Sequence, residues 1–212
     1  MHPPATFDTW QLAALAATLG FASGVRLYAV LFIVGALGYS GWIALPGGLT
    51  ALAHPYVIAA SGFMLAAEFF ADKIPGVDSA WDFVHTFVRI PAGAALAASV
   101  FGDAGPATTL AAAILGGSLA AGSHLTKSGA RVLINTSPEP FSNWSASFAE
   151  DLSVVTLVWL AFAHPLAAII VVALLVVLSI VLLPRLWRAI RGIARRIGAM
   201  FGSAHYDRAG HE

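Results

Sequence analysis

The sequence predicts an all-α membrane protein with about six transmembrane helices, an internal helix-hairpin repeat and a C-terminal amphipathic basic helix. Of its 212 residues, 58% are hydrophobic and 10% are charged, whereas soluble domains average roughly 45–50% and about 25%. Residues 166–183 (LAAIIVVALLVVLSIVLL) contain Ser179 as their only polar side chain, and a run of this length suits a membrane-spanning helix. Because such long runs show no strand-like alternation, we expect helices rather than a barrel.

The apolar segments form one predicted polytopic domain, residues 1–183, and short breaks rich in glycine and proline separate them. Together with residues 166–183, five further segments give six predicted spans: about 25–45, 56–71, 83–101, 107–125 and 146–163. Residues 10–22 are too short to span a bilayer alone. The passage GFASGVR at residues 20–26 is typical of a break in a helix, so we expect an interfacial or re-entrant helix there.

The positions of lysine and arginine predict the orientation, because these residues favour cytoplasmic loops. With six spans, the loops around Lys73 and Lys127–Arg131 fall on the same side as the arginine-rich C-terminal segment. The opposite loops, at 46–54, 102–106 and 163–165, contain no lysine or arginine. We therefore expect the two proline loops and both termini to be cytoplasmic.

The C-terminal segment, residues 184–212, is positively charged, although the net charge of the whole chain is zero. It holds six arginines against two acids, a balance of +4, so the rest of the chain carries −4. Apolar residues at spacings of three and four from Leu186 to Met200 predict an amphipathic helix that contacts anionic lipid headgroups; a regulatory or partner-binding role is the alternative. The predicted membrane-surface anchors are Arg185, Arg188, Arg191, Arg195 and Arg196.

Residues of about 55–101 and 107–163 share a layout that indicates an internal repeat. In each, a Gly- and Ala-rich helix ends near a lysine, a proline loop follows, and a tryptophan opens a second helix. Lys73 corresponds to Lys127 and Trp81 to Trp144, with one insertion in the second loop. Two-helix units have the same orientation, so these would be parallel repeats, an arrangement common in transporters.

The charges of the body concentrate on these two units. Asp78, Asp82, His85 and Arg89 stand at i, i+4, i+7 and i+11, so on one helix they form a single polar stripe. Ionisable groups in a bilayer are costly, and they normally turn inward, pair and mark a pathway. With Arg26 from the predicted helix break, the candidate pathway residues are Arg26, Glu68, Asp72, Lys73, Asp78, Asp82, His85, Arg89, His124, Lys127, Glu150 and Asp151.

Simpler interpretations of these residues stay open. Asp72, Lys73, Asp78 and Asp82 could occupy a wet cytoplasmic loop, and Arg89 could bridge to Glu150 or Asp151 only to hold the bundle together.

Two candidate residues have more specific interpretations. His85 could relay protons or simply pack against its neighbours. Arg26, at a predicted helix start, could cradle a carboxylate or phosphate together with Arg89 and Lys127.

Several function classes find no support in the sequence. The chain has no cysteine, and lysine and arginine interleave with the carboxylates, so we expect no metal site. No nucleotide loop, hydrolase or metalloprotease motif, or basic-aromatic nucleic-acid surface is present, and we expect no enzyme activity and no cofactor. Asn135 and Asn143 each lie in a glycosylation sequon, but a cytoplasmic location would make both chance matches.

The strings GFASGVRLYAVLFIVGALG (20–38), EFFADKIPGVDSAWDFVHTFVRIPAG (68–93), HLTKSGARVL (124–133) and AEDL (149–152) resemble the bacterial integral-membrane family known as domain of unknown function 4126. The resemblance covers about residues 10–183. It implies a polytopic protein of the bacterial inner membrane. The family has no established activity, so the resemblance transfers no catalytic roles.

These observations favour a small transporter or channel-like protein that moves an ion or a small anionic solute. Its polar cavity would be lined by Glu68, Asp82, His85, Arg89, Lys127, Glu150 and Asp151. A monomer of this size offers little room for a pathway, which favours a homo-oligomer. The alternatives are a lipid-handling protein that binds a phosphorylated headgroup or carrier lipid, and a structural or assembly partner in a membrane complex.

Overall fold

The structure, a computed structural model, describes residues 7–209 except 75, 103 and 137–139, with side chains up to Arg196. Within this part the chain is all-α, as predicted, and no strand occurs. The elements are α1 (Thr9–Tyr39), the 3-10 helix η1 (Gly47–Ala53), α2 (Pro55–Ala71), α3 (Val77–Val100), α4 (Pro106–Ile134), α5 (Pro140–Ala163) and α6 (Pro165–Ala209). Four of these helices open on a proline, namely Pro55, Pro106, Pro140 and Pro165, because proline suits the first helical turn.

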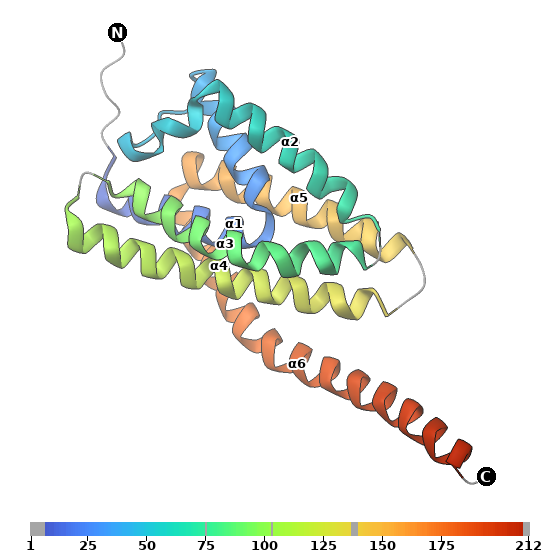
Figure 1. Cartoon of the computed structure of the whole chain (residues 1–212). Helices are drawn as coiled ribbons and strands as arrows, with labels where there is room; N and C mark the ends of the chain where they lie inside the picture. Colours follow the sequence, from blue (N-terminus) through green and yellow to red (C-terminus); the bar gives the residue numbers. More distant parts are fainter. Residues whose placement is uncertain (1–6, 75, 103, 137–139, 210–212) are drawn as a thin grey trace.

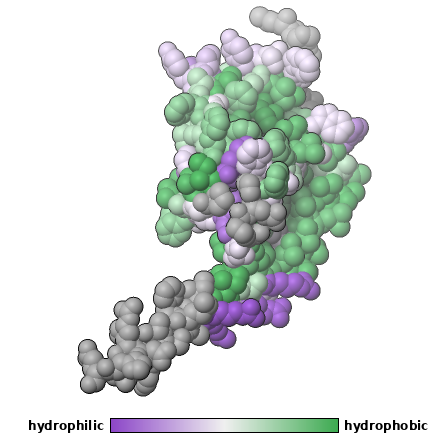
Figure 2. Space-filling view, turned by 90° about the vertical axis from the view of Figure 1, so that its right-hand side faces the viewer, coloured by the Kyte–Doolittle hydropathy of each residue, from purple (hydrophilic) through white to green (hydrophobic). Residues whose placement is uncertain are grey.

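Four helices in the described part are long and apolar enough to cross a membrane, and η1 with α2 forms a bent fifth candidate. The four are α1, α3, α5 and α6. Large apolar side chains such as Phe63, Phe87 and Trp159 are exposed on the outside of the bundle, and Figure 2 shows a mostly hydrophobic surface. This distribution is that of a multi-pass membrane protein, whose outer face contacts lipid.

The helices run between two ends of the bundle (Figure 1). We call the end with the α2–α3 turn (Asp72–Gly76) and the end of α4 the charged end. The other, called the far end, holds the α3–α4 turn and His164 between α5 and α6. The α2–α3 and α4–α5 hairpins both run from the far end to the charged end and back, the direction expected for parallel repeats; the duplication itself stays a prediction.

Helix α1 is broken at Arg26, and we call it re-entrant because both of its arms lead back to the same end of the bundle. Arg26 has non-helical dihedral angles, φ −148° and ψ 88°, which confirms the predicted break. The first arm starts beside Phe101 at the far end, where Ala13 lines the same cavity. The second arm returns there, because Leu37 shares a cavity with Phe162 at the end of α5 (Figure 1). Residues 25–45 are therefore not a separate crossing helix, as the span count assumed.

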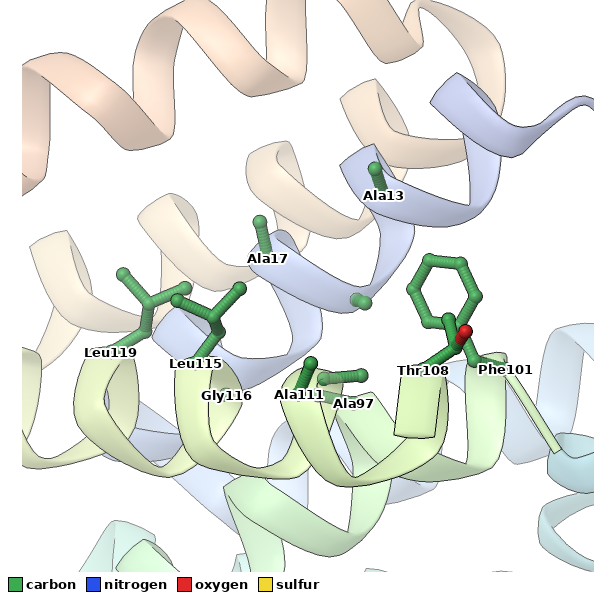
Figure 3. A pocket seen from close by; sticks show the side chains of 11 residues that line it. Ala13, Ala17, Ala97, Phe101, Thr108, Ala111, Leu115, Gly116 and Leu119 are labelled. Carbon is green, nitrogen blue, oxygen red and sulfur yellow. The ribbon is translucent and has the colours of Figure 1, made fainter. Parts of the chain in front are cut away.

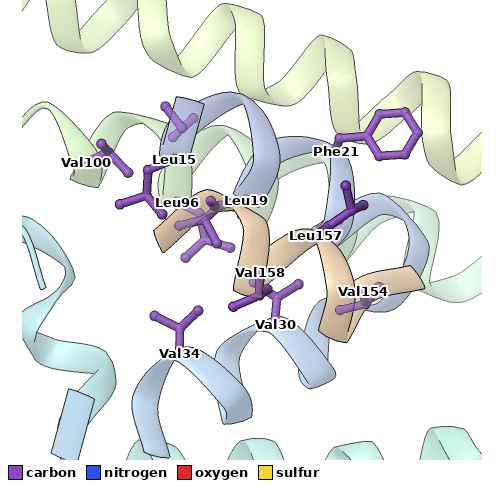
Figure 4. Close-up of a cluster of buried hydrophobic side chains, with 14 of the residues drawn as sticks. Leu15, Leu19, Phe21, Val30, Val34, Leu96, Val100, Val154, Leu157 and Val158 are labelled. Carbon is purple, nitrogen blue, oxygen red and sulfur yellow. The ribbon is translucent and has the colours of Figure 1, made fainter. Parts of the chain in front are cut away.

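Small residues allow the first arm of α1 to lie against α4. A Cβ on Gly20 would come within 2.8 Å of the Cα of Gly116, and one on Gly24 within 2.0 Å of the Ser123 hydroxyl oxygen. The buried apolar core joins both arms of α1 to α5, with Leu19, Val30 and Val158 at its centre (Figure 4). The re-entrant helix is thus the most enclosed element, which excludes the alternative that residues 10–22 lie on the membrane surface.

Helix α6 passes along α4 and then leaves the bundle. The helix runs through Pro184 as one element, without a break at the predicted domain boundary (Figure 1). Leu186, which follows, lies against Gly129 of α4. The predicted anchor arginines are exposed, and hydrophilic side chains gather where α6 leaves the bundle (Figure 2). The side chains of Ile197 and Met200 lie outside the described residues.

The described chain begins and ends at opposite ends of the bundle. Thr9 lies at the far end. Helix α6 also starts at the far end, but it passes Gly129 of α4 and projects away from the bundle in the direction of the charged end (Figure 1). The sequence-based expectation placed both termini on one side, because it counted residues 25–45 as a complete span. In the structure the second arm of α1 returns toward the far end instead, and the side of the membrane on which each terminus lies stays a prediction.

Candidate functional site

Ten ionisable side chains meet near the tip of α1 and form what we call the charge network. Each lies within 4.0 Å of an oppositely charged partner in the network. Its members are Arg26, Glu68, Asp72, Asp78, Asp82, Arg89, Lys127, Arg131, Glu150 and Asp151. Nine of them were named as pathway candidates from the sequence; Arg131 was not.

Helical spacing explains why these side chains converge. Asp78, Asp82, His85 and Arg89 are all buried on one face of α3, which confirms the predicted stripe. Asp72 is also fully buried. The alternative that these aspartates occupy a wet loop is therefore wrong.

Lys127 occupies the centre of the network. Its Nζ lies 3.3 Å from Glu150, 3.5 Å from Asp82, 3.8 Å from Glu68 and 3.9 Å from Asp72. It also donates a hydrogen bond of 3.1 Å to the carbonyl oxygen of Val25. That carbonyl precedes the break in α1, where backbone oxygens lose their partners in the helix.

Arg89 joins α3 to α2. Its Nη1 lies 2.9 Å from the carboxylate of Asp82, and its Nη2 contacts Glu68. All three side chains are almost completely buried. The prediction that Arg89 pairs with Glu150 or Asp151 is wrong, because Asp82, two turns away on the same helix face, and Glu68 from the facing helix occupy its guanidinium.

Arg26 joins the tip of α1 to the turn after α2 and to α5. Its Nη2 lies 2.7 Å from Asp72, and its Nε lies 2.8 Å from Asp151. Nη2 also donates to the hydroxyl of Ser147 at 2.6 Å, a contact that the sequence did not suggest. The anion cradle predicted for Arg26, Arg89 and Lys127 is thus filled by the protein's own carboxylates.

Arg131 makes the bidentate pair of the network. Its Nε and Nη2 donate to the two oxygens of Glu150 at 2.9 and 3.0 Å, and its Nη1 donates to the backbone oxygen of Asn143 at 3.1 Å. Asn143 in turn donates to Asn135, which donates to Asp78. Both asparagines of the sequons therefore serve internal hydrogen bonds, and Asn143 is buried.

The two candidate histidines have different surroundings. Arg89 donates to Nδ1 of His124 at 3.1 Å; since arginine can only donate, this nitrogen carries no proton, and His124 is neutral. His85 stacks on Trp81 with ring centroids 4.2 Å apart and contacts the edge of Tyr28. His85 thus packs beside the network rather than within it.

Lys73 does not belong to the charge network. Its Nζ donates to the backbone oxygen of Phe69 at 3.1 Å and lies 3.0 Å from the centroid of the Phe69 ring. Partial burial, reinforced by the charge of Arg26, lowers the pKa of Lys73. The two lysines that the repeat aligns thus have different environments.

The network is electrically balanced at its centre. The four carboxylates around Lys127 match the four bases of the network in number. Asp78 and Asp151 lie at the periphery: Asp78 accepts from the backbone N–H of Ser79 at 2.6 Å, at the start of α3, and the Asp151 side chain is 29% exposed. The helix N-terminus stabilises the negative charge of Asp78, and Arg26 stabilises that of Asp151.

A cavity of about 220 Å³ borders the network between α1, α4, α5 and α6. Lys127, Arg131 and Glu150 line it together with hydroxyl and apolar groups. A second cavity, of about 280 Å³, lies toward the far end and is lined by residues such as Ala17, Phe101 and Leu115 (Figure 3). In the described part of the chain, no three His, Asp or Glu side chains are arranged to hold a metal ion.

A comparison with protein-family models gives one match: "Domain of unknown function (DUF4126)", over residues 13–185. The chain belongs to this family. The DUF4126 match covers both arms of α1 and every member of the charge network, whereas the basic segment after Arg185 lies outside it. No curated protein matches the chain, and no solved structure does. The family name carries no activity, so the function has to be argued from the site.

Proposed function

We propose that this DUF4126 protein is a small membrane transporter or channel-like protein that moves an ion through the charge network. One observation carries the proposal: ten ionisable side chains surround the tip of a broken, re-entrant helix inside an apolar bundle. Ionisable groups inside a membrane mark ion pathways, and broken helices present free backbone groups to coupling ions in transporters. We propose the inner membrane of a bacterium as its location, with the charged end cytoplasmic.

Energetics favours a functional over a purely structural network. Taking paired charges out of water costs several kcal/mol per ion, and apolar residues of similar volume often give equal or greater stability. A bundle with extensive apolar packing (Figure 4) therefore has no need of ten charges to fold. Their presence at a helix break supports ion movement instead.

The contacts favour a cation over an anion as the moving species. Each of the three arginines is held by at least two carboxylates, so an anion would have to break existing pairs before it could bind. A cation would meet a surplus of carboxylates, six against four bases.

Lipid handling is the second candidate, and one observation favours it. The cavity beside Lys127 and Arg131 is lined on its other side by Leu175 and Leu178 of α6. An acyl chain fits such a lining, and a phosphorylated headgroup would then lie near the two bases. This would require a base to exchange its carboxylate partner for the headgroup.

Ion flux into proteoliposomes tests the proposal. We expect flux that depends on an imposed ion or pH gradient in the unmodified protein, and its loss in Arg89→Ala and Glu150→Gln. Arg191→Gln, on the exposed part of α6, should retain it. Absence of flux for every ion tested, with phosphorylated lipid retained by the purified protein, would favour lipid handling instead.

A further inference from the structure

We propose that the four carboxylates around Lys127 form a binding site for a small monovalent cation when the ammonium group of Lys127, its resting occupant, moves out. With the ammonium in place, the described acidic side chains are not arranged to hold a metal ion. We call these carboxylates, Glu68, Asp72, Asp82 and Glu150, the carboxylate cage. The inference deepens the proposed function, on which it rests, by naming the class of ion that is moved.

The distances indicate that Lys127 fills the cage without being locked to any one carboxylate. Its four Nζ–O distances lie between 3.3 and 3.9 Å, longer than the roughly 2.7–2.9 Å of a charge-assisted hydrogen bond. Its one short contact is with the carbonyl oxygen of Val25. The ammonium group of Lys127 is compact, sits on a flexible stem and acts here as a point charge. A free cation in the same position would also act as a point charge.

The cage is held together independently of Lys127. Arg89 contacts Glu68 and Asp82. Arg26 contacts Asp72, and Arg131 grips Glu150 through two hydrogen bonds. If the ammonium left, four carboxylates would face three arginines, a charge of −1. One monovalent cation would restore the charge that the cage has with Lys127 in place.

Buried carboxylate oxygens of the cage also lack a hydrogen-bond donor. The Oε2 of Glu68 and the Oδ1 of Asp72 have no hydrogen-bond partner, although both side chains are completely buried. Leaving a buried polar atom unsatisfied is costly. Lys127 Nζ faces the other oxygen of each carboxylate, Oε1 of Glu68 and Oδ2 of Asp72. Both carboxylates would therefore have to turn to present their free oxygens, together with the carbonyl of Val25, to an incoming cation.

The ammonium also has space into which it can move. Lys127 lines the cavity of about 220 Å³, whose wall carries the hydroxyls of Ser153 and Ser179. Rotation of the lysine stem into this cavity would release Val25 at the break in α1. Exchange of the tethered ammonium for a free cation would therefore couple ion binding to the position of the α1 tip.

Cation-dependent stability of Lys127→Gln tests the proposal in purified protein. Thermal unfolding is measured at one ionic strength in ammonium, potassium, sodium and choline chlorides. We expect Lys127→Gln to be stabilised saturably by at least one small cation, with a Tm rise of about 5–10 °C near 100 times its Kd. Choline, which is too large for the cage, should give no such rise, and the unmodified protein should show no selective effect.

Two further variants sharpen the experiment. Lys127→Gln combined with Asp82→Asn leaves three carboxylates against three arginines, and we expect it to lose the cation effect. Lys73→Gln removes the other lysine of the chain, which lies outside the cage, and should show no cation dependence.

Three outcomes would overturn the proposed cation site. The Tm of Lys127→Gln could rise equally in choline, it could rise only when the pH is lowered, or the variant could be unfolded in every salt. Binding without flux would instead contradict the proposed function, so the two failures are distinguishable.

Discussion

Lys127 of α4 donates a hydrogen bond to the carbonyl oxygen of Val25, the last residue of the first arm of α1 before it breaks at Arg26. The break thus lies against the centre of the charge network rather than in the apolar core. Arg26 itself extends the same connection to Asp72 and Asp151. The course of the re-entrant helix and the geometry of the network therefore depend on each other.

Gly24→Ala should displace the tip of α1. A Cβ at this position would meet the Ser123 hydroxyl oxygen at 2.0 Å and the backbone oxygen of Ala120 at 2.2 Å, and overpacking costs about 1–3 kcal/mol. Gly122→Ala is the matched control, because a Cβ there has nothing within 4 Å and alanine favours the helix. Thermal unfolding in detergent should show a loss for Gly24→Ala only; equal stability of both variants would contradict the tight contact.

Arg89 and Glu68 should show strong energetic coupling. Removing one partner of a buried pair leaves an uncompensated charge and costs about 3–5 kcal/mol. We therefore expect Arg89→Gln and Glu68→Gln each to be strongly destabilised, and the double variant to lose much less than the sum of the two. A double-mutant cycle on the free energy of unfolding measures this; additive losses would show that the two side chains do not interact.

The two lysines should differ in their contributions to stability. Lys127→Met leaves four carboxylates without their shared base and should cost about 3–5 kcal/mol at neutral pH. Lys73→Met loses one contact with Phe69, worth less than about 1 kcal/mol at a partly exposed site. Equal Tm values for the two variants would place Lys127 outside the network.

Single-cysteine labelling should reveal the re-entrant course of α1. The chain has no cysteine of its own, so Thr9→Cys, Ser40→Cys, Thr136→Cys and Arg191→Cys can each be labelled alone. With a membrane-impermeant maleimide, we expect positions 9 and 40 to react from one side and positions 136 and 191 from the other. Reaction of positions 9 and 40 from opposite sides would mean that α1 crosses the membrane.

Local spacing made part of this site predictable. Gly20, Gly24 and Arg26 indicated the helix break, and the i, i+7 spacing placed Asp82 and Arg89 on one face of α3. These are properties of a single helix, which the sequence specifies directly. The buried state of the stripe followed from the cost of ionisable groups in a membrane.

The partners across helices were not predictable in the same way. Arg89 could reach carboxylates on several helices, and only the packing of α2 against α3 selects Glu68 over Glu150. The sequence analysis interpreted Asn135 and Asn143 only as parts of glycosylation sequons and so missed their roles in the network. Their position beside an apolar helix could have indicated that they form hydrogen bonds to the buried charges. The sequence allows either a re-entrant or an interfacial course for residues 10–22, since the break at Arg26 fixes where the helix bends but not its direction.

The most direct test of the central claim, that the charge network conducts an ion, is a measurement of charge displacement on a solid-supported membrane after a rapid cation jump. The unmodified protein should give a transient current that Arg191→Gln retains and Glu150→Gln abolishes. A current of equal size in Glu150→Gln would contradict the account. The absence of any current in the unmodified protein with ammonium, potassium, sodium and protons would also contradict it.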